Sequence, residues 1–191
     1  MYPYIIPFLF YVLSIPLINF GNWIILRFAV LSLLILALWK FYSFKLKFEL
    51  FPLFIGVIIF LVWILTEGHY PLIGATYFEP RDTILLIVRV LSFVAITPVI
   101  EEFFVRYFLA RILIQNDWKK IQLGKFIPAT FIITTLFFGF SHNRWLPGLI
   151  AGALLNYLIM KKKNMGSVIL AHSFANILLV IYIVYTKSWG F

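Results

Sequence analysis

Long apolar segments separated by short polar loops dominate this chain and limit what it can fold into. Several of these segments approach the roughly 20 residues that a helix needs to cross a bilayer. The composition agrees, because 63% of the residues are hydrophobic and only 12% are charged, which is too little polar surface for a soluble protein. The sequence therefore predicts an all-α, polytopic transmembrane helical bundle and excludes soluble folds.

Seven apolar segments can be drawn, with boundaries good to about 2–4 residues. They cover residues 3–20, 23–39, 50–66, 84–115, 126–142, 146–160 and 165–186. Gly21 and Asn22 are turn formers, so we expect a tight antiparallel hairpin between the first two segments. We treat 1–191 as a single integral membrane domain, in which 1–83 form peripheral N-terminal helices and 84–186 form the core that carries the candidate site.

The positive charges indicate the orientation of the bundle. Three loops hold most of the cations, namely Lys40, Lys45 and Lys47, then Arg111, Lys119, Lys120 and Lys125, then Lys161, Lys162 and Lys163. By the positive-inside rule these loops and the N-terminus are cytoplasmic. The net charge of +9 does not indicate nucleic acid, because the cations lie between apolar segments rather than along one face. We expect membrane lipid as a partner and no nucleic acid.

The segment 84–115 is too long for one upright crossing. About 32 residues at 1.5 Å each reach roughly 48 Å, whereas the hydrocarbon core is near 30 Å thick. The segment must tilt, kink or protrude, and Pro98 predicts a kink beside Glu101 because proline removes a helical hydrogen bond.

Few side chains within the apolar segments can carry chemistry. There is no cysteine, and only seven acidic residues and three histidines occur. The candidates inside or at the end of a segment are Glu101, Glu102, Arg106, His142, His172 and Asn176. Ionisable groups at membrane depth are costly and are retained where they face protein or water, usually for a function. Because three segments contribute them, we expect a shared cavity.

Helical geometry separates the two adjacent glutamates. Glu102 and Arg106 are spaced i and i+4, so they lie on one face and can pair, whereas Glu101 is turned by about 100° and can face another helix. A buried ion pair that only holds helices together is the alternative reading of Glu102 and Arg106.

The two histidines also have partners at helical spacing. Phe138 and His142 are i and i+4, which places an aromatic ring and an imidazole on one face. His172 and Asn176 share a face in the same way. The alternatives without catalysis are an interfacial histidine that anchors a helix end and a polar pair that hydrogen bonds between membrane helices.

These groups suit hydrolysis. A carboxylate in an apolar cavity can take a proton from water with the help of a nearby imidazole, while Asn176 and His172 can donate hydrogen bonds to a developing oxyanion. Alternatively, Glu101, His142 and His172 can bind zinc. The residues alone leave both mechanisms open.

Three motifs resemble those of a known family: EEFFVR reads as EExxxR, FGFSH as FxxxH and HSFAN as HxxxN. In this order, across residues 101–176, they resemble the CPBP family, which comprises the type II CAAX prenyl endopeptidases and the bacteriocin-immunity relatives called Abi proteins. The short chain and its apolar start are similar to the bacterial branch associated with exosortase systems. This resemblance implies an integral protein of the bacterial inner (plasma) membrane.

The resemblance also implies roles for the residues. Glu101 and His142 would activate water, His172 and Asn176 would hold the oxyanion, and a second group comprising Glu102, Arg106 and Phe138 would support the site. The family has been described as metalloproteases and as glutamate-type proteases, and the free face of Glu101 favours the second. We therefore expect no tightly held metal or other cofactor, with zinc as the alternative, and a membrane-associated protein or peptide as the substrate.

Two other functions fit the same residues. A non-catalytic interaction or immunity protein could use the polar cavity to bind a partner helix, and a proton-coupled transporter could relay protons through it. The depths of His142 and His172 agree only if residues 125–128 project from the membrane, which predicts a site that opens toward the cytoplasmic side.

Overall fold

The computed structural model describes residues 1–17, 22–42, 44–74 and 77–191. Throughout this described part every regular element is helical and no strand occurs. The elements are α1 (Tyr2–Leu13), α2 (Trp23–Ala37), α3 (Leu50–Leu65), α4 (Thr83–Leu91), α5 (Thr97–Glu102), α6 (Ala110–Ile112), α7 (Pro128–Phe140), α8 (Trp145–Lys162) and α9 (Met165–Thr186). The all-helical prediction is confirmed.

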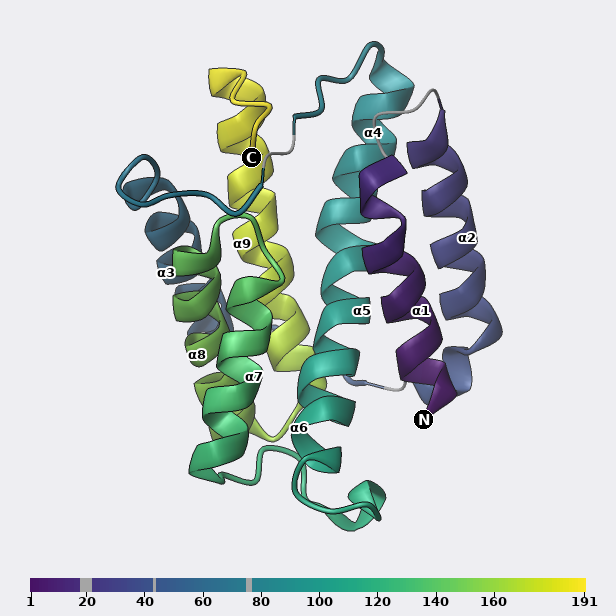
Figure 1. Ribbon diagram of the computed structural model, residues 1–191, viewed down its shortest axis with the longest axis vertical. Helices are drawn as coiled ribbons and strands as arrows, with labels where there is room; N and C mark the ends of the chain where they lie inside the picture. Colours follow the sequence, from purple (N-terminus) through teal and green to yellow (C-terminus); the bar gives the residue numbers. More distant parts are fainter. Residues whose placement is uncertain (18–21, 43, 75–76) are drawn as a thin grey trace.

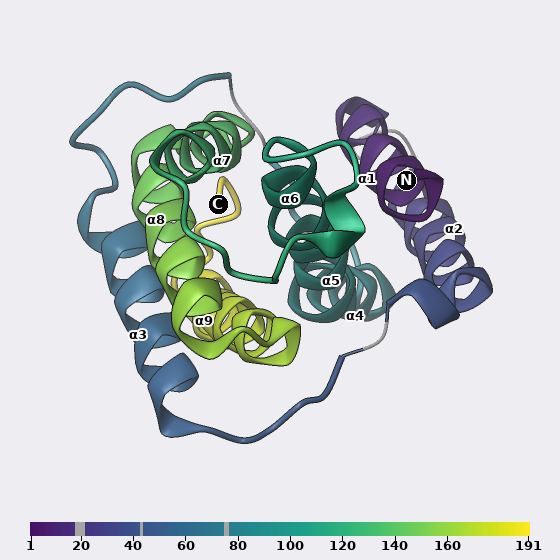
Figure 2. The same cartoon turned by 90° about the horizontal axis from the view of Figure 1, so that it is seen from below.

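Helices occupy each of the seven predicted segments, and most boundaries agree within a few residues. The first segment differs, because α1 ends at Leu13 and a 3₁₀ turn, Ile15–Leu17, follows. Pro16 lies in that turn and has no N–H with which to continue the helix. The turn predicted at Gly21 lies outside the described residues, but α1 and α2 run antiparallel and side by side, as a hairpin requires (Figures 1 and 2).

Two helices are long and apolar enough to cross a membrane, Thr83–Ile112 and Met165–Thr186, and several shorter apolar helices surround them. Thr83–Ile112 contains α4, α5 and α6 and runs the length of the molecule (Figure 1). Viewed along the helix axes, α1 and α2 lie on one side of it, while α3, α7, α8 and α9 lie on the other (Figure 2). Candidate site residues from α5, α7 and α9 can therefore meet in the middle.

Glycines let the helices of the second group approach closely. A Cβ at Gly148 would lie 3.1 Å from the Cα of Gly139, and one at Gly152 would lie 3.2 Å from the carbonyl oxygen of Thr135. These contacts join α8 to α7. Close backbone approach through small residues is how helices pack in membranes, where lipid removes much of the hydrophobic driving force.

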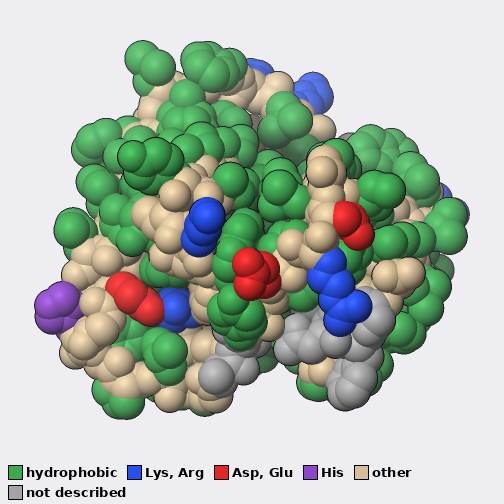
Figure 3. Space-filling model, turned by 90° about the horizontal axis from the view of Figure 1, so that it is seen from above, with side chains coloured by type: hydrophobic (Ala, Val, Ile, Leu, Met, Phe, Trp, Pro, Cys, Tyr) green, Lys and Arg blue, Asp and Glu red, His purple; other side chains and the backbone are tan. Residues whose placement is uncertain are grey.

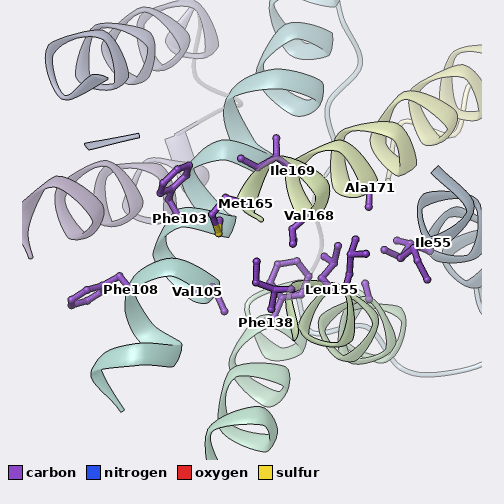
Figure 4. Close-up of a cluster of buried hydrophobic side chains, with 14 of the residues drawn as sticks. Ile55, Phe103, Val105, Phe108, Phe138, Leu155, Met165, Val168, Ile169 and Ala171 are labelled. Atoms are coloured by element: carbon purple, nitrogen blue, oxygen red, sulfur yellow. The ribbon is translucent and has the colours of Figure 1, made fainter. Parts of the chain in front are cut away.

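A buried apolar cluster forms the core of the bundle. Side chains of α9, α8, α7, α3 and residues 103–109 converge on one another in Figure 4, including Val168, Leu155, Phe138, Ile55 and Val105. The outer surface is apolar as well, because large hydrophobic side chains on every long helix are exposed. An apolar interior with an apolar exterior fits lipid rather than water as the surrounding solvent.

The two ends of the bundle differ in charge. The N-terminus, α6 and the loop that follows it lie at one end, while the loop 66–82 and the C-terminus lie at the other (Figure 1). Figure 3 looks onto the second end, where a few charged side chains are scattered among hydrophobic ones. The three basic loops of the sequence lie at the first end.

Candidate active site

The structure brings three of the predicted residues together around one atom, the Oε2 of Glu101. This oxygen lies 4.0 Å from Nε2 of His142 and 3.9 Å from Nε2 of His172. Glu101 is 5% exposed, and among the described residues its Oε2 has no hydrogen-bond partner. The three side chains come from α5, from the residues after α7 and from α9, so the shared cavity expected from the sequence is present.

In both histidines the nitrogen that points away from Glu101, Nδ1, has a hydrogen-bond partner of its own. Nδ1 of His142 lies 2.6 Å from the carbonyl oxygen of Phe138, and Nδ1 of His172 lies 2.8 Å from Oε1 of Glu102. Both partners are acceptors, so we assign the proton of each neutral ring to Nδ1. Each Nε2 is then free to accept a hydrogen bond in front of Glu101.

Glu102 and Arg106 form the ion pair that their spacing predicts. Nη1 of Arg106 donates to Oε1 of Glu102 at 3.2 Å, and the two residues are 1% and 0% exposed. Arg106 also donates to Oδ1 of Asn156 and to the carbonyl oxygen of Gly152, both at 3.2 Å. Since the same oxygen of Glu102 accepts from His172, this pair positions the His172 ring.

Phe138 forms part of the site wall, as the sequence suggested. Its ring centroid lies 4.1 Å from the guanidinium carbon of Arg106, 4.8 Å from the His142 ring and 5.9 Å from the His172 ring. One aromatic ring therefore contacts the cation and both imidazoles.

Asn176 makes a hydrogen bond to another helix, which was the alternative to an oxyanion donor in the sequence analysis. Its Nδ2 donates to the carbonyl oxygen of Phe93 at 2.7 Å, so this N–H is not available to an oxyanion. Residues 92–96 form a π-helical turn in which Thr97 donates to Ser92. The next donor in that register would be Pro98, which has no N–H. The side chain of Asn176 thus replaces the missing backbone donor.

Around Pro98, where the sequence predicted a kink, the helix changes its winding. A second π-helical segment, Phe103–Leu109, follows α5, so Glu101 and Glu102 lie on a short α-helical stretch between two widened turns. Such π-helical turns occur frequently at functional sites.

Two cavities meet at Glu101. The inner one is about 80 Å³ and includes His172, Asn176 and Trp63 in its lining. The outer one is about 260 Å³ and extends to Phe78 and Trp189. Both are lined by the same five residues, Tyr11, Phe93, Thr97, Glu101 and His142. A ligand in the outer cavity therefore has direct access to Glu101 and His142.

The outer cavity lies toward the end of the bundle that carries the loop 66–82 and the C-terminus (Figure 1). The sequence predicted an opening toward the end with the basic loops, and that prediction is wrong. The reason is that His142 follows α7, whose last residues lie at the same end as the loop 66–82, and the cavity continues from His142 in that direction.

The cavity-lining residues outside the set selected from the sequence include Tyr11, Arg27 and Arg89. The sequence analysis started from the acidic residues and histidines, so it did not select these three residues. The two arginines carry a sequence signal nevertheless, because each lies inside an apolar segment, 23–39 or 84–115, where a charge is unusual. Tyr11 carries no such signal.

The described residues contain no group of three His, Cys, Asp or Glu side chains arranged to hold a metal ion. The nearest set is Glu101 with His142 and His172, whose nitrogens surround a single carboxylate oxygen at 3.9–4.0 Å.

A mostly apolar helical bundle that encloses a carboxylate and two imidazoles beside a cavity has the parts of a membrane-embedded hydrolase. The family model described as type II CAAX prenyl endopeptidase Rce1-like matches residues 83–178, about half of the chain. The chain belongs to this family, so it is a membrane protein of the CAAX-protease type, and the predicted CPBP resemblance is confirmed. The matched residues run from α4 into α9 and include every candidate taken from the motifs. No curated protein and no solved structure matches the chain.

Proposed function

We propose that this protein is an intramembrane endopeptidase of the glutamate type, in which Glu101 is the general base. The observation that supports this most directly is the buried Oε2 of Glu101, which faces Nε2 of His142 at 4.0 Å and Nε2 of His172 at 3.9 Å. These separations exceed a direct hydrogen bond. They suit one water molecule that donates to Glu101 and to His142.

The proposed reaction needs no group from outside the chain except water. The water oxygen attacks the peptide carbonyl carbon while its proton passes to Oε2 of Glu101. Collapse of the tetrahedral intermediate breaks the C–N bond, and the proton held by Glu101 passes to the leaving amine. His142 keeps the water in line through Nε2, because its Nδ1 is tied to Phe138.

The oxyanion requires a donor in the same cavity. Nε2 of neutral His172 is an acceptor, so this ring donates to the oxyanion only after a second proton binds at Nε2, while Glu102 accepts from Nδ1. Asn176 has a second N–H beyond the one that binds Phe93. Its principal role in this proposal is to hold the π-helical turn beside Glu101, and Arg106 and Phe138 support the ring of His172.

The test compares wild type with Glu101→Gln, which keeps the shape of the side chain and removes the base. The purified protein in detergent is incubated with a set of fluorogenic single-span membrane peptides, and cleavage is followed by fluorescence and mass spectrometry. We expect at least a 100-fold lower rate for the variant. Glu79→Gln, an exposed glutamate on the loop 66–82, is the matched control and should cleave normally. Equal rates for Glu101→Gln and wild type would refute the proposal.

Non-catalytic binding and proton-coupled transport are the competing functions of the same cavity. Full biological function in a Glu101→Ala, His142→Ala double variant would support binding, such as that of an immunity protein. Proton-coupled uptake in vesicles that Glu102→Gln abolishes would support transport. The substrate that we propose is a membrane-associated protein or peptide, and no part of the proposal requires a prenyl group, zinc or another cofactor.

We also propose that the bundle is polytopic in a bacterial inner membrane, with the N-terminus in the cytoplasm. The support is the concentration of loop cations at one end of the molecule. Because the chain has no cysteine, single substitutions at exposed Lys119 and Lys187 report the topology. A membrane-impermeant maleimide should label Lys187→Cys in intact cells and Lys119→Cys only after lysis. The opposite pattern would reverse the orientation.

A further inference from the structure

Arg27 is a buried cation in the wall of the outer cavity. It lies on α2, near the helix start at Trp23, and is 6% exposed. It lines the outer cavity together with Glu101. The segment that carries it is outside the part of the chain matched by the family, so none of the motifs includes it.

The hydrogen-bond partners described for Arg27 are neutral. Its Nε donates to Oγ of Ser14 at 2.8 Å, its Nη2 donates to the carbonyl oxygen of Tyr11 at 3.1 Å, and its guanidinium carbon lies 4.5 Å from the Tyr11 ring centroid. Across the described residues no carboxylate lies within 4.0 Å of it.

Two other buried arginines of this chain are paired with acids, whereas Arg111 donates to backbone carbonyl oxygens and does not line the outer cavity. Arg106 contacts Glu102 at 3.2 Å, and Arg144 contacts Glu67 at 2.6 Å. A buried cation without a counterion is costly, and in a membrane protein such a group usually belongs to a ligand or ion pathway. Arg27 therefore has no carboxylate in direct contact, and the carboxylate whose charge acts on it is that of Glu101, which lines the same cavity.

Tyr11 connects Arg27 to the candidate active site. Its carbonyl oxygen and ring contact Arg27, while its side chain lines both cavities with Glu101 and His142. An anion bound to Arg27 would thus lie in the same cavity as Glu101, on the other side of one aromatic ring. A guanidinium binds carboxylates in a bidentate, oriented manner.

We propose that Arg27 binds a carboxylate of the substrate and thereby places the neighbouring peptide bond over Glu101. The carboxylate is either a chain terminus or an acidic side chain, and the apolar remainder of the cavity, including Phe8, Ile24 and Val180, surrounds the adjacent residues. A lipid phosphate fits less well, because Arg27 is only 6% exposed and lies in the wall of the outer cavity. The inference rests on the proposed peptidase function, but its test measures binding and needs no hydrolysis.

The experiment uses the full chain in detergent with the Glu101→Gln substitution, so that no ligand is consumed. Three octanoylated tetrapeptides are titrated by calorimetry: Leu-Phe-Ala-Phe with a free carboxylate, the same peptide as the carboxamide, and Leu-Phe-Glu-Phe as the carboxamide. We expect at least one carboxylate peptide to bind about 10- to 100-fold more tightly than the peptide without a carboxylate. The peptide that binds most tightly shows whether Arg27 prefers a terminal or a side-chain carboxylate.

Arg27→Gln should reduce this preference to less than about twofold, and Arg27→Lys should keep part of it because the charge remains. Arg81→Gln makes the same charge change at an exposed position of the same end and should keep the full preference. Equal affinities of the parent protein for all three peptides would overturn the proposal without reference to any variant. So would a preference that survives Arg27→Gln, or Arg27-dependent binding of octyl phosphate as tight as that of the best peptide.

Discussion

Removal of the Arg106 guanidinium should be among the most destabilising single changes in this bundle. Arg106 and Glu102 are almost completely buried, and Arg106 donates to Glu102, Asn156 and Gly152 at 3.2 Å. Arg106→Met keeps similar volume but leaves the Glu102 carboxylate with His172 as its remaining described partner. Removing one member of a buried ion pair costs about 3–5 kcal/mol in proteins.

The membrane setting moves the expected value to the lower end of that range. An unfolded chain in detergent or lipid also finds partners for its polar groups, so polar contributions are smaller there. We therefore expect Arg106→Met to lower the free energy of unfolding by about 3 kcal/mol. Glu102→Gln in the Arg106→Met background removes the uncompensated charge and should restore about 2 kcal/mol.

The assay is a double-mutant cycle, with unfolding followed by steric trapping or by titration with a denaturing detergent. Arg111→Met is the matched control, because Arg111 is also buried but donates to the carbonyl oxygens of Ile121 and Lys119 at 2.8 and 2.9 Å. Glu102→Gln should not rescue it. A cost below about 1 kcal/mol for Arg106→Met, or no recovery in the double variant, would refute the reasoning.

Two further predictions concern the helix packing around the site. Asn176→Leu leaves the Phe93 carbonyl unsatisfied and should lower the free energy of unfolding by about 1–3 kcal/mol. Adding Pro98→Ala restores a backbone N–H and should remove most of that loss. Equal losses with and without Pro98→Ala, measured by the same unfolding assay, would contradict this account. Gly56→Ala places a Cβ 2.7 Å from the carbonyl oxygen of Ala171. The substitution should force α3 away from α9 and lower the free energy of unfolding by about 1–3 kcal/mol. An unchanged free energy of unfolding would contradict this prediction.

Local patterns in the sequence were sufficient to predict the helices and one ion pair. The apolar segments predict the helices because a backbone in lipid must satisfy its own hydrogen bonds, and helices do so within one segment. The pairing of Glu102 with Arg106 follows from the i and i+4 spacing alone. For the same reason Phe138 and His142 were expected on one face, and their rings do contact each other at 4.8 Å.

Contacts between helices could not be predicted in the same way, because no periodicity relates residues of different segments. The hydrogen bond from Asn176 to Phe93 depends on a π-helical turn that the sequence did not predict, and it occupies one N–H of the side chain that was assigned to the oxyanion. Arg27 approaches the site only because α1 and α2 pack beside α5. Tyr11 contacts Arg27 and lines the same cavity as Glu101.

The sequence by itself determined an all-helical membrane protein, its family motifs and the residue types available for chemistry, because hydropathy and helical spacing are local properties. The tertiary structure decided which atoms meet. It placed Nε2 of His142 and Nε2 of His172 around a single oxygen of Glu101, brought Nδ1 of each ring against Phe138 or Glu102, and placed the outer cavity at the end away from the basic loops. The physical reason is that side-chain packing between helices sets their relative depth and rotation, and neither quantity is encoded in any one segment.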